Sequence, residues 1–129
     1  MTQQPKVLIL EDDMLVALSL RDLLRLTGCE VTGVAASVND ALSLAQGTKP
    51  DLALIDVHLA GPRDGIEGAE LLHQQFGIPV IFLTGDIDKV TARRASGFGP
   101  YLMKPVHGQQ LVEAIRGAMN SAGPTLTAA

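Results

Sequence analysis

The chain has 129 residues, of which 47% are hydrophobic and 19% are charged; this composition suits one folded domain and excludes a compositionally disordered chain. The net charge of −4 argues against a broad nucleic-acid surface, and no apolar run approaches the roughly 18 residues of a membrane span, so we expect neither direct nucleic-acid binding nor membrane insertion. The N-terminus shows no secretion signal and the single cysteine, Cys29, allows no internal disulfide, so we expect a cytoplasmic protein.

Short apolar runs alternate along the chain with segments of helical periodicity. The runs predict five strands, at residues 7–10, 31–35, 52–55, 80–83 and 101–103. The helical spacing predicts five helices, at residues 14–27, from the N-cap Ser37 to a stop at 47–50, from the N-cap Asp64 to residue 76, at about 87–95 and at 108–120. We therefore expect one domain over residues 1–122 and a flexible tail over residues 123–129.

This alternation of strands and helices predicts the architecture of the domain. It is typical of an α/β fold with a parallel sheet and helices on both faces, joined by right-handed crossovers. For five units we predict the doubly wound, flavodoxin-like (βα)5 arrangement with strand order 2-1-3-4-5. Ligands of such sheets bind beyond the carboxyl ends of the strands, at the switch point between strands 1 and 3.

Chemically active residues follow the strands that are expected near this switch point. They are Glu11, Asp12 and Asp13 after the first strand, Asp56 after the third, Thr84 and Gly85 after the fourth, and Lys104 and Pro105 after the fifth. Although these residues lie far apart in the sequence, the predicted fold gathers them into one cleft.

Three of these residues predict a metal site. Two carboxylates about 4 Å apart repel by roughly 4 kcal/mol at an effective dielectric of 20, so Glu11, Asp12 and Asp56 need a cation or a proton between them. Oxygen-only ligands suit Mg²⁺ better than a soft metal, and no cluster of cysteine or histidine competes for the role.

A magnesium ion beside a carboxylate, an ammonium and a hydroxyl is a set of groups suited to phosphoryl transfer. The transferred group spreads negative charge over three oxygens, which the metal, Lys104 and Thr84 would bind. Asp56, at the centre, would be the nucleophile that forms an acyl phosphate. Gly85 has no side chain and leaves room for the incoming group.

At this point the chain resembles a known family, the receiver domains of two-component response regulators. The resemblance runs from about residue 6 to residue 120 and rests on five motifs in order, V-L-I-L-E-D-D, D-L-A-L-I-D-V, D-G-I-E, I-P-V-I-F-L-T-G and Y-L-M-K-P. Singly each motif is weak, but together they are specific.

The resemblance assigns roles to the residues around the metal. It implies that Glu11 and Asp12 hold Mg²⁺, with Asp12 the more direct ligand. It also implies that Asp56 is the phosphoacceptor as well as a metal ligand, and that the main-chain carbonyl of His58 is a further ligand.

The resemblance also implies a conformational switch. Thr84 and Lys104 would sense the phosphoryl group, with a cis peptide between Lys104 and Pro105. Tyr101 matches the family's switch aromatic, which moves inward when Thr84 engages the phosphate; plain packing of this tyrosine is the alternative. Helix 4, strand 5 and helix 5 would form the output face.

Two spacings depart from the family's pattern. The loop from Asp56 to the Asp64–Gly65 pair carries one residue more than usual, and the interval from Thr84 to Lys104 is slightly short. The second departure predicts a shortened or irregular fourth helix. The departures leave the phosphorylation chemistry intact but put a standard output surface in question.

Several polar residues near the motifs have two interpretations. Asp13 is either a third metal ligand or, as we expect, an N-cap at the start of the first helix. The side chains of His58 and Asp86 either control the water that hydrolyses the acyl phosphate or are exposed loop residues.

The resemblance implies that the chain is a phosphoaccepting switch and not an enzyme. It would catalyse only the transfer of a phosphoryl group to itself and its own dephosphorylation. Its phosphodonor would be a histidine kinase or a histidine phosphotransfer protein, and its output a protein contact, with phosphorylation-dependent homodimerisation as a variant. A single-domain regulator is our first hypothesis, because little chain follows Asn120. A receiver cut from a hybrid kinase or multidomain regulator is the alternative, and a Mg²⁺-dependent aspartyl-phosphate phosphatase is the third.

Overall fold

The computed structural model describes residues 4–85 and 88–122, and within these ranges strands and helices alternate as predicted. The strands are β1 (Lys6–Leu10), β2 (Glu30–Ala35), β3 (Leu52–Asp56), β4 (Val80–Thr84) and β5 (Tyr101–Met103). The helices are α1 (Met14–Leu26), α2 (Val38–Thr48), α3 (Gly65–Phe76), α4 (Lys89–Ser96) and α5 (Gly108–Ala122).

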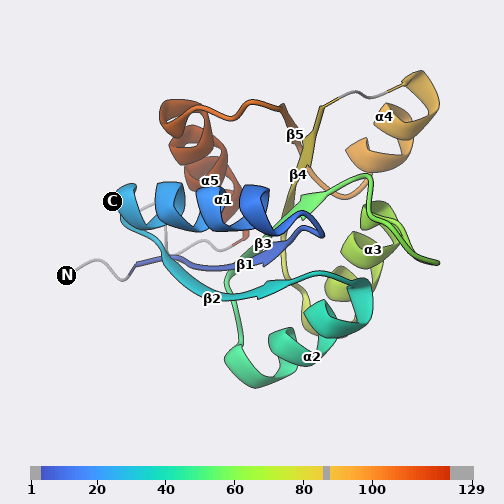
Figure 1. The fold of residues 1–129 in the computed structure, drawn as a ribbon, viewed down its shortest axis with the longest axis horizontal. Coiled ribbons are helices and arrows are strands. Elements are labelled where there is room, and N and C mark those ends of the chain that lie inside the picture. The colour runs from blue at the N-terminus through green and yellow to red at the C-terminus, as the bar shows by residue number, and fades with distance from the viewer. Residues whose placement is uncertain (1–3, 86–87, 123–129) are drawn as a thin grey trace.

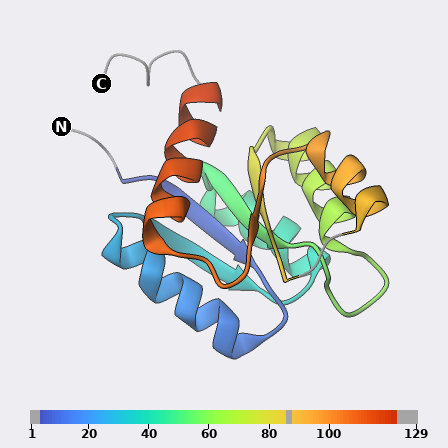
Figure 2. The ribbon, with the colours of Figure 1, turned by 90° about the horizontal axis from the view of Figure 1, so that it is seen from above.

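The five strands form one parallel sheet in the order β2-β1-β3-β4-β5, which confirms the predicted topology. In the register of this sheet, Asp56 at the end of β3 lies opposite Leu83 of β4, and Thr84 lies opposite Met103 of β5. The carboxyl ends of β1, β3, β4 and β5 therefore reach the same edge, and in Figure 2 the loops that follow β1, β3 and β5 lie at that end of the sheet.

Two hydrophobic cores hold the sheet between its helices. Successive residues of a strand point to opposite faces, so β1 sends Val7 and Ile9 into one core and Leu8 and Leu10 into the other, all fully buried. Helices α1 and α5 cover the first face, and α2 and α3 cover the second, with Ala95 of α4 (Figure 1). Burial on both faces explains why the strands are continuous apolar runs.

Side-chain caps set the helix starts. Ser37 and Asp64 cap α2 and α3, as predicted, by accepting hydrogen bonds from the amides of Asp40 and Glu67. Helix α4 begins at Lys89, later than predicted, because the Asp88 side chain caps it; residue 87 lies outside the described residues.

The last two helices differ in length from one another and from the prediction. Helix α4 spans 8 residues, whereas α5 spans 15 and continues two residues beyond the predicted end at residue 120. The predicted tail, residues 123–129, lies outside the described residues. None of the described helices combines the length and the apolar character needed to cross a bilayer.

Helix α3 begins so close to β3 that only glycine fits at its first residue. A Cβ atom at Gly65 would overlap the backbone carbonyl oxygen of Asp56, and the Gly65 amide donates to the Val57 carbonyl at 3.1 Å. The first turn of α3 therefore packs directly on the backbone that carries Asp56.

We predict that Gly65→Ala destabilises the domain by about 1–3 kcal/mol, because the added methyl group must displace the backbone of Asp56. Gly47→Ala is the matched control: a Cβ there meets nothing within 4 Å, and replacing a helical glycine by alanine stabilises by roughly 0.5–1 kcal/mol. Urea unfolding of both variants measures the difference, and equal stabilities would contradict this account of the α3 start.

Candidate functional site

Three carboxylates from two neighbouring strands meet at the carboxyl edge of the sheet. Glu11 and Asp12 follow β1, and Asp56 is the last residue of β3. One oxygen from each lies within 4.8 Å of the others. Glu11 and Asp56 are only 2% and 7% exposed, whereas Asp12 is open to solvent. The structure thus brings together the acidic residues that the sequence places at these two strand ends.

Lys104 supplies the positive charge that these buried carboxylates need. Its Nζ donates to Glu11 Oε1 at 2.9 Å and to Asp56 Oδ2 at 3.1 Å. The Lys104 amide donates to the Thr84 carbonyl at 2.8 Å, which continues the pairing of β5 with β4 up to the site. The Lys104–Pro105 peptide bond is cis, as the resemblance implied.

The contacts of Lys104 keep its ammonium charged although it is partly desolvated. Burial lowers the pKa of Lys104, but the hydrogen bonds and charges of Glu11 and Asp56 outweigh burial and raise it overall. Lys104 therefore remains a cation throughout the neutral range.

Glu11 shows the opposite balance of forces. Burial raises the pKa of Glu11, and the nearby Asp56 adds to this, while hydrogen bonds from Lys104 and from the Asp13 amide lower it; the net effect is a rise. Both Glu11 oxygens are engaged, because Oε2 accepts from the Asp13 amide at 3.1 Å. One lysine does not fully offset the burial of this carboxylate beside another.

Backbone amides of the loop between β3 and α3, residues 57–64, also bind the acidic group. The His58 amide donates to Asp56 Oδ1 at 2.9 Å, and the Ala60 amide donates to Asp12 Oδ2 at 2.7 Å. Hydrogen bonds from N–H groups to carboxylates are stronger than neutral ones. The loop therefore places partial positive charge on carboxylate oxygens that Lys104 does not bind.

The donor set fits a hard divalent cation such as Mg²⁺. All three side chains are carboxylates, and no other group of three or more acidic, histidine or cysteine residues in the described part of the chain converges in this way. When ionised, the three carboxylates and Lys104 leave two negative charges uncompensated. A dication with oxygen ligands would neutralise them.

The remaining predicted residues lie around this group in different environments. Thr84 is fully buried at the end of β4, whereas Tyr101 is 43% exposed at the start of β5, so the tyrosine faces outward here. His58 is exposed, and Asp86 lies outside the described residues. Asp13 accepts from the amides of Leu15 and Val16, which confirms the expectation that it is the N-cap of α1.

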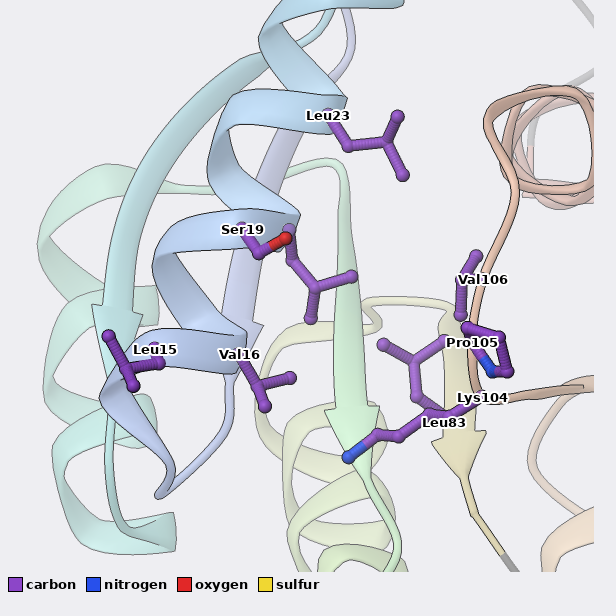
Figure 3. Close-up of a pocket in the computed structure, with 9 residues that line it drawn as sticks. Leu15, Val16, Ser19, Leu23, Leu83, Lys104, Pro105 and Val106 are labelled. Atoms are coloured by element: carbon purple, nitrogen blue, oxygen red, sulfur yellow. The ribbon is translucent and has the colours of Figure 1, made fainter.

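A groove beside Lys104 was not predicted from the sequence. It has a volume of about 370 Å³ and is lined by Leu15, Val16, Ser19, Leu20, Leu23, Leu83, Lys104, Pro105 and Val106. In Figure 3, Val16 and Leu23 point from α1 toward the loop that carries Pro105 and Val106, and the Lys104 nitrogen reaches the end of β3. Leu15 of this lining is 81% exposed, and apolar periodicity alone does not distinguish such a residue from a core residue.

An ion pair that joins α4 to the N-cap of α3 was also not predicted from the sequence. Both terminal nitrogens of Arg94 lie 3.5 Å from Asp64 Oδ2, while Asp64 Oδ1 caps α3. The sequence offers no local signal for this pair, because its members are 30 residues apart.

We predict that in metal-free protein Glu11 titrates above its ordinary value of 4.5, because burial outweighs the contacts that lower its pKa. The fold then binds this proton more tightly than the unfolded chain, so ionisation of Glu11 reduces stability as pH rises from 4.5 through the folded-state pKa. Lys104→Gln should raise the pKa further, and Lys89→Gln, on exposed α4, should not. Carbon-13 NMR titration of the Glu11 carboxyl measures both, and a Glu11 pKa at or below 4.5 would refute the assignment.

Comparison with known proteins identifies the family. The protein-family model that describes the response regulator receiver domain matches residues 7–116 of this chain. The transcriptional regulatory protein PdtaR of Mycobacterium tuberculosis is 36% identical over 117 residues, which cover 89% of this chain and 57% of PdtaR. The DNA-binding response regulator MtrA of Mycobacterium bovis is 32% identical, with 89% of this chain and 50% of MtrA covered. The chain thus spans about half the length of these curated relatives.

Solved structures agree with the sequence matches. The signal receiver domain of a modulated diguanylate cyclase from Desulfovibrio desulfuricans G20 has a TM-score of 0.88 and 37% identity, covering 93% of this chain and 97% of that one. A CheY-like receiver domain protein from Methanospirillum hungatei JF-1 has a TM-score of 0.81 and 27% identity, with the same coverage of both chains. The chain therefore belongs to the response regulator receiver domains of two-component signalling.

Proposed function

We propose that Asp56 accepts a phosphoryl group, in a Mg²⁺-dependent reaction, from a phosphohistidine of a partner kinase or phosphotransfer protein. The observation that carries this proposal is the contact of the Lys104 ammonium with both Glu11 and Asp56 inside a group of three carboxylates. A carboxylate nucleophile, a cation beside it and a set of oxygen ligands for a second cation are the parts that phosphoryl transfer requires.

The reaction moves one phosphoryl group between two side chains. A carboxylate oxygen of Asp56 attacks phosphorus, the P–N bond of the donor phosphohistidine breaks, and the imidazole leaves with the electron pair. Lys104 and Thr84 would bind oxygens of the transferred group. Glu11, Asp12 and Asp56 would hold Mg²⁺ with the main-chain carbonyl of His58, and the metal would supply positive charge to the phosphoryl oxygens.

The same site would later release the phosphate. Water attacks the phosphorus of the acyl phosphate, which returns the Asp56 carboxylate and inorganic phosphate. The domain would then act as a self-resetting switch, with no separate substrate and no role as an enzyme on other molecules.

The groove between α1 and the loop after β5 supports a docking place for the phosphodonor. Its lining is mostly apolar, and Lys104 belongs both to the groove and to the acidic site, so a partner seated there lies next to Asp56. The exposed Leu15 at the start of α1 suits contact with an apolar face of a helix that carries the donor histidine.

The surface at β5 supports a role in output. Tyr101 and Met103 expose 43% and 47% of their areas on this edge strand, between α4 and α5. Movement of Thr84 toward a phosphoryl group would open space for Tyr101 to turn inward and would change this surface. We propose a downstream protein as its partner in the cytoplasm. A second copy of the chain remains an alternative partner.

The lengths of PdtaR and MtrA bear on the wider architecture. Their names describe a transcriptional regulator and a DNA-binding regulator, and this chain matches only about half of each. Both a single-domain regulator and a receiver that is part of a longer regulator or hybrid kinase are compatible with the phosphoacceptor role proposed here.

We predict that Asp56→Asn abolishes acid-labile phosphorylation by a small acyl phosphate in the presence of Mg²⁺, because the amide is not a competent nucleophile. Removing Mg²⁺ with a chelator should suppress labelling of the unmodified protein. Asp22→Asn, which removes the same charge from the exposed face of α1, should label normally. Intact-mass spectrometry measures the product, and persistent labelling of Asp56→Asn would eliminate Asp56 as the acceptor.

We predict that beryllofluoride, which imitates a phosphoryl group, protects Tyr101 from solvent in the presence of Mg²⁺. The chain has one tyrosine and no tryptophan, so tyrosine fluorescence reports on this residue alone. Quenching by acrylamide should fall on addition of the mimic, and Thr84→Ala should abolish the fall, while Thr32→Ala on β2 should preserve it. Unchanged quenching in the unmodified protein would remove Tyr101 from the switch.

A further inference from the structure

The loop between β3 and α3 holds the metal-site carboxylates at one side. It is the segment that is one residue longer than the family's usual spacing, and it lies beside the carboxyl edge of the sheet (Figure 2). Its first part is anchored to the sheet, because the Val57 amide donates to the Leu83 carbonyl at 3.1 Å. Its end is anchored to α3 by the cap at Asp64.

The chain bends sharply in this loop, over residues 60–63. Gly61 has a φ of +108°, a conformation that residues with a side chain rarely adopt, and Pro62 follows it. A Cβ at Gly61 would meet nothing within 4 Å, so glycine is needed there for its backbone conformation and not for space. Directly before this bend, the Ala60 amide donates to Asp12, which lies 48 residues earlier in the chain.

Asp12 differs from its two partners in how it is held. Glu11 and Asp56 are buried and bound to Lys104, whereas Asp12 is exposed and makes no contact with that lysine in the described structure. The hydrogen bond that the structure shows for its side chain is the 2.7 Å contact from the Ala60 amide. An exposed carboxylate without such a donor samples several rotamers, and ordering it on metal binding costs entropy.

We propose that the Ala60 amide is a positioning group that fixes the Asp12 carboxylate for Mg²⁺, and that the Gly61 turn is what places it. The inference rests on the proposed function, in which Asp12 is a metal ligand. Groups that orient metal ligands through hydrogen bonds commonly change metal affinity by 10- to 100-fold when they are lost. Because the bond comes from a backbone amide, the conformation of the loop sets the affinity, independently of the side chain at position 60.

Gly61→Ala tests the proposal, with Gly28→Ala as its matched control. Both glycines have positive φ, at +108° and +93°, and neither would bring a Cβ within 4 Å of another atom, but Gly28 follows α1 at the far end of β2 from the site. Both variants should lose similar stability in urea without metal. Only Gly61→Ala should weaken Mg²⁺ binding, by about tenfold in calorimetric titration. Ala60→Ser, which keeps the amide, should bind Mg²⁺ normally.

A backbone ester in place of the amide of Ala60 replaces the N–H donor by an oxygen and leaves every side chain unchanged, and it should weaken Mg²⁺ binding by a similar factor. Unchanged or tighter binding in the ester or in Gly61→Ala, or equal weakening in Gly28→Ala, would overturn the proposal. Failure of the proposed function would give a different result. In that case the unmodified protein itself would bind no Mg²⁺.

Discussion

The electrostatics of the candidate site are set by the repulsion among three carboxylates that the parallel sheet brings to one edge. Oxygens of Glu11, Asp12 and Asp56 lie within 4.8 Å of one another, and two partly buried unit charges at such a separation repel by roughly 3.5 kcal/mol at an effective dielectric of 20. The single ammonium of Lys104 offsets part of this repulsion. The pKa of Glu11 is nevertheless raised, chiefly by burial and further by the neighbouring Asp56. The two uncompensated negative charges of such a site are what a dication would neutralise, in keeping with the proposed Mg²⁺-dependent phosphoacceptor.

The hydrophobic cores make this unfavourable arrangement tolerable. Apolar residues on both faces of β1, β3 and β4 are fully or almost fully buried, so the strand ends cannot move apart without exposing core side chains. The approach of Gly65 to the Asp56 carbonyl fixes α3 against the same strand. Burial of the apolar strands thus provides the free energy that holds like charges together.

Helix α4 is less firmly packed than the rest of the domain. It is short, and Ala95 is its one buried residue among the side chains that are described. Its other contacts include the Asp88 cap and the exposed ion pair of Arg94 with Asp64, and an exposed pair contributes roughly 0–1 kcal/mol. Helix α4 follows the strand that ends at Thr84, and its ion pair reaches Asp64 at the end of the loop that binds Asp12 and Asp56, so under the proposed function α4 is the helix that would shift at least cost.

The sequence by itself determined the order of elements, the parallel topology and which strand ends carry carboxylates, hydroxyl and lysine, since apolar periodicity and caps are local signals. It also indicated Asp13 as a cap and the shortened fourth helix. Tertiary structure alone decided that Lys104 contacts Glu11 as well as Asp56, that the Ala60 amide reaches Asp12, and that α1 forms a groove with the loop after β5. These features join segments that are 48 or more residues apart, and the partner of a polar group is selected by packing in three dimensions, which no local pattern records.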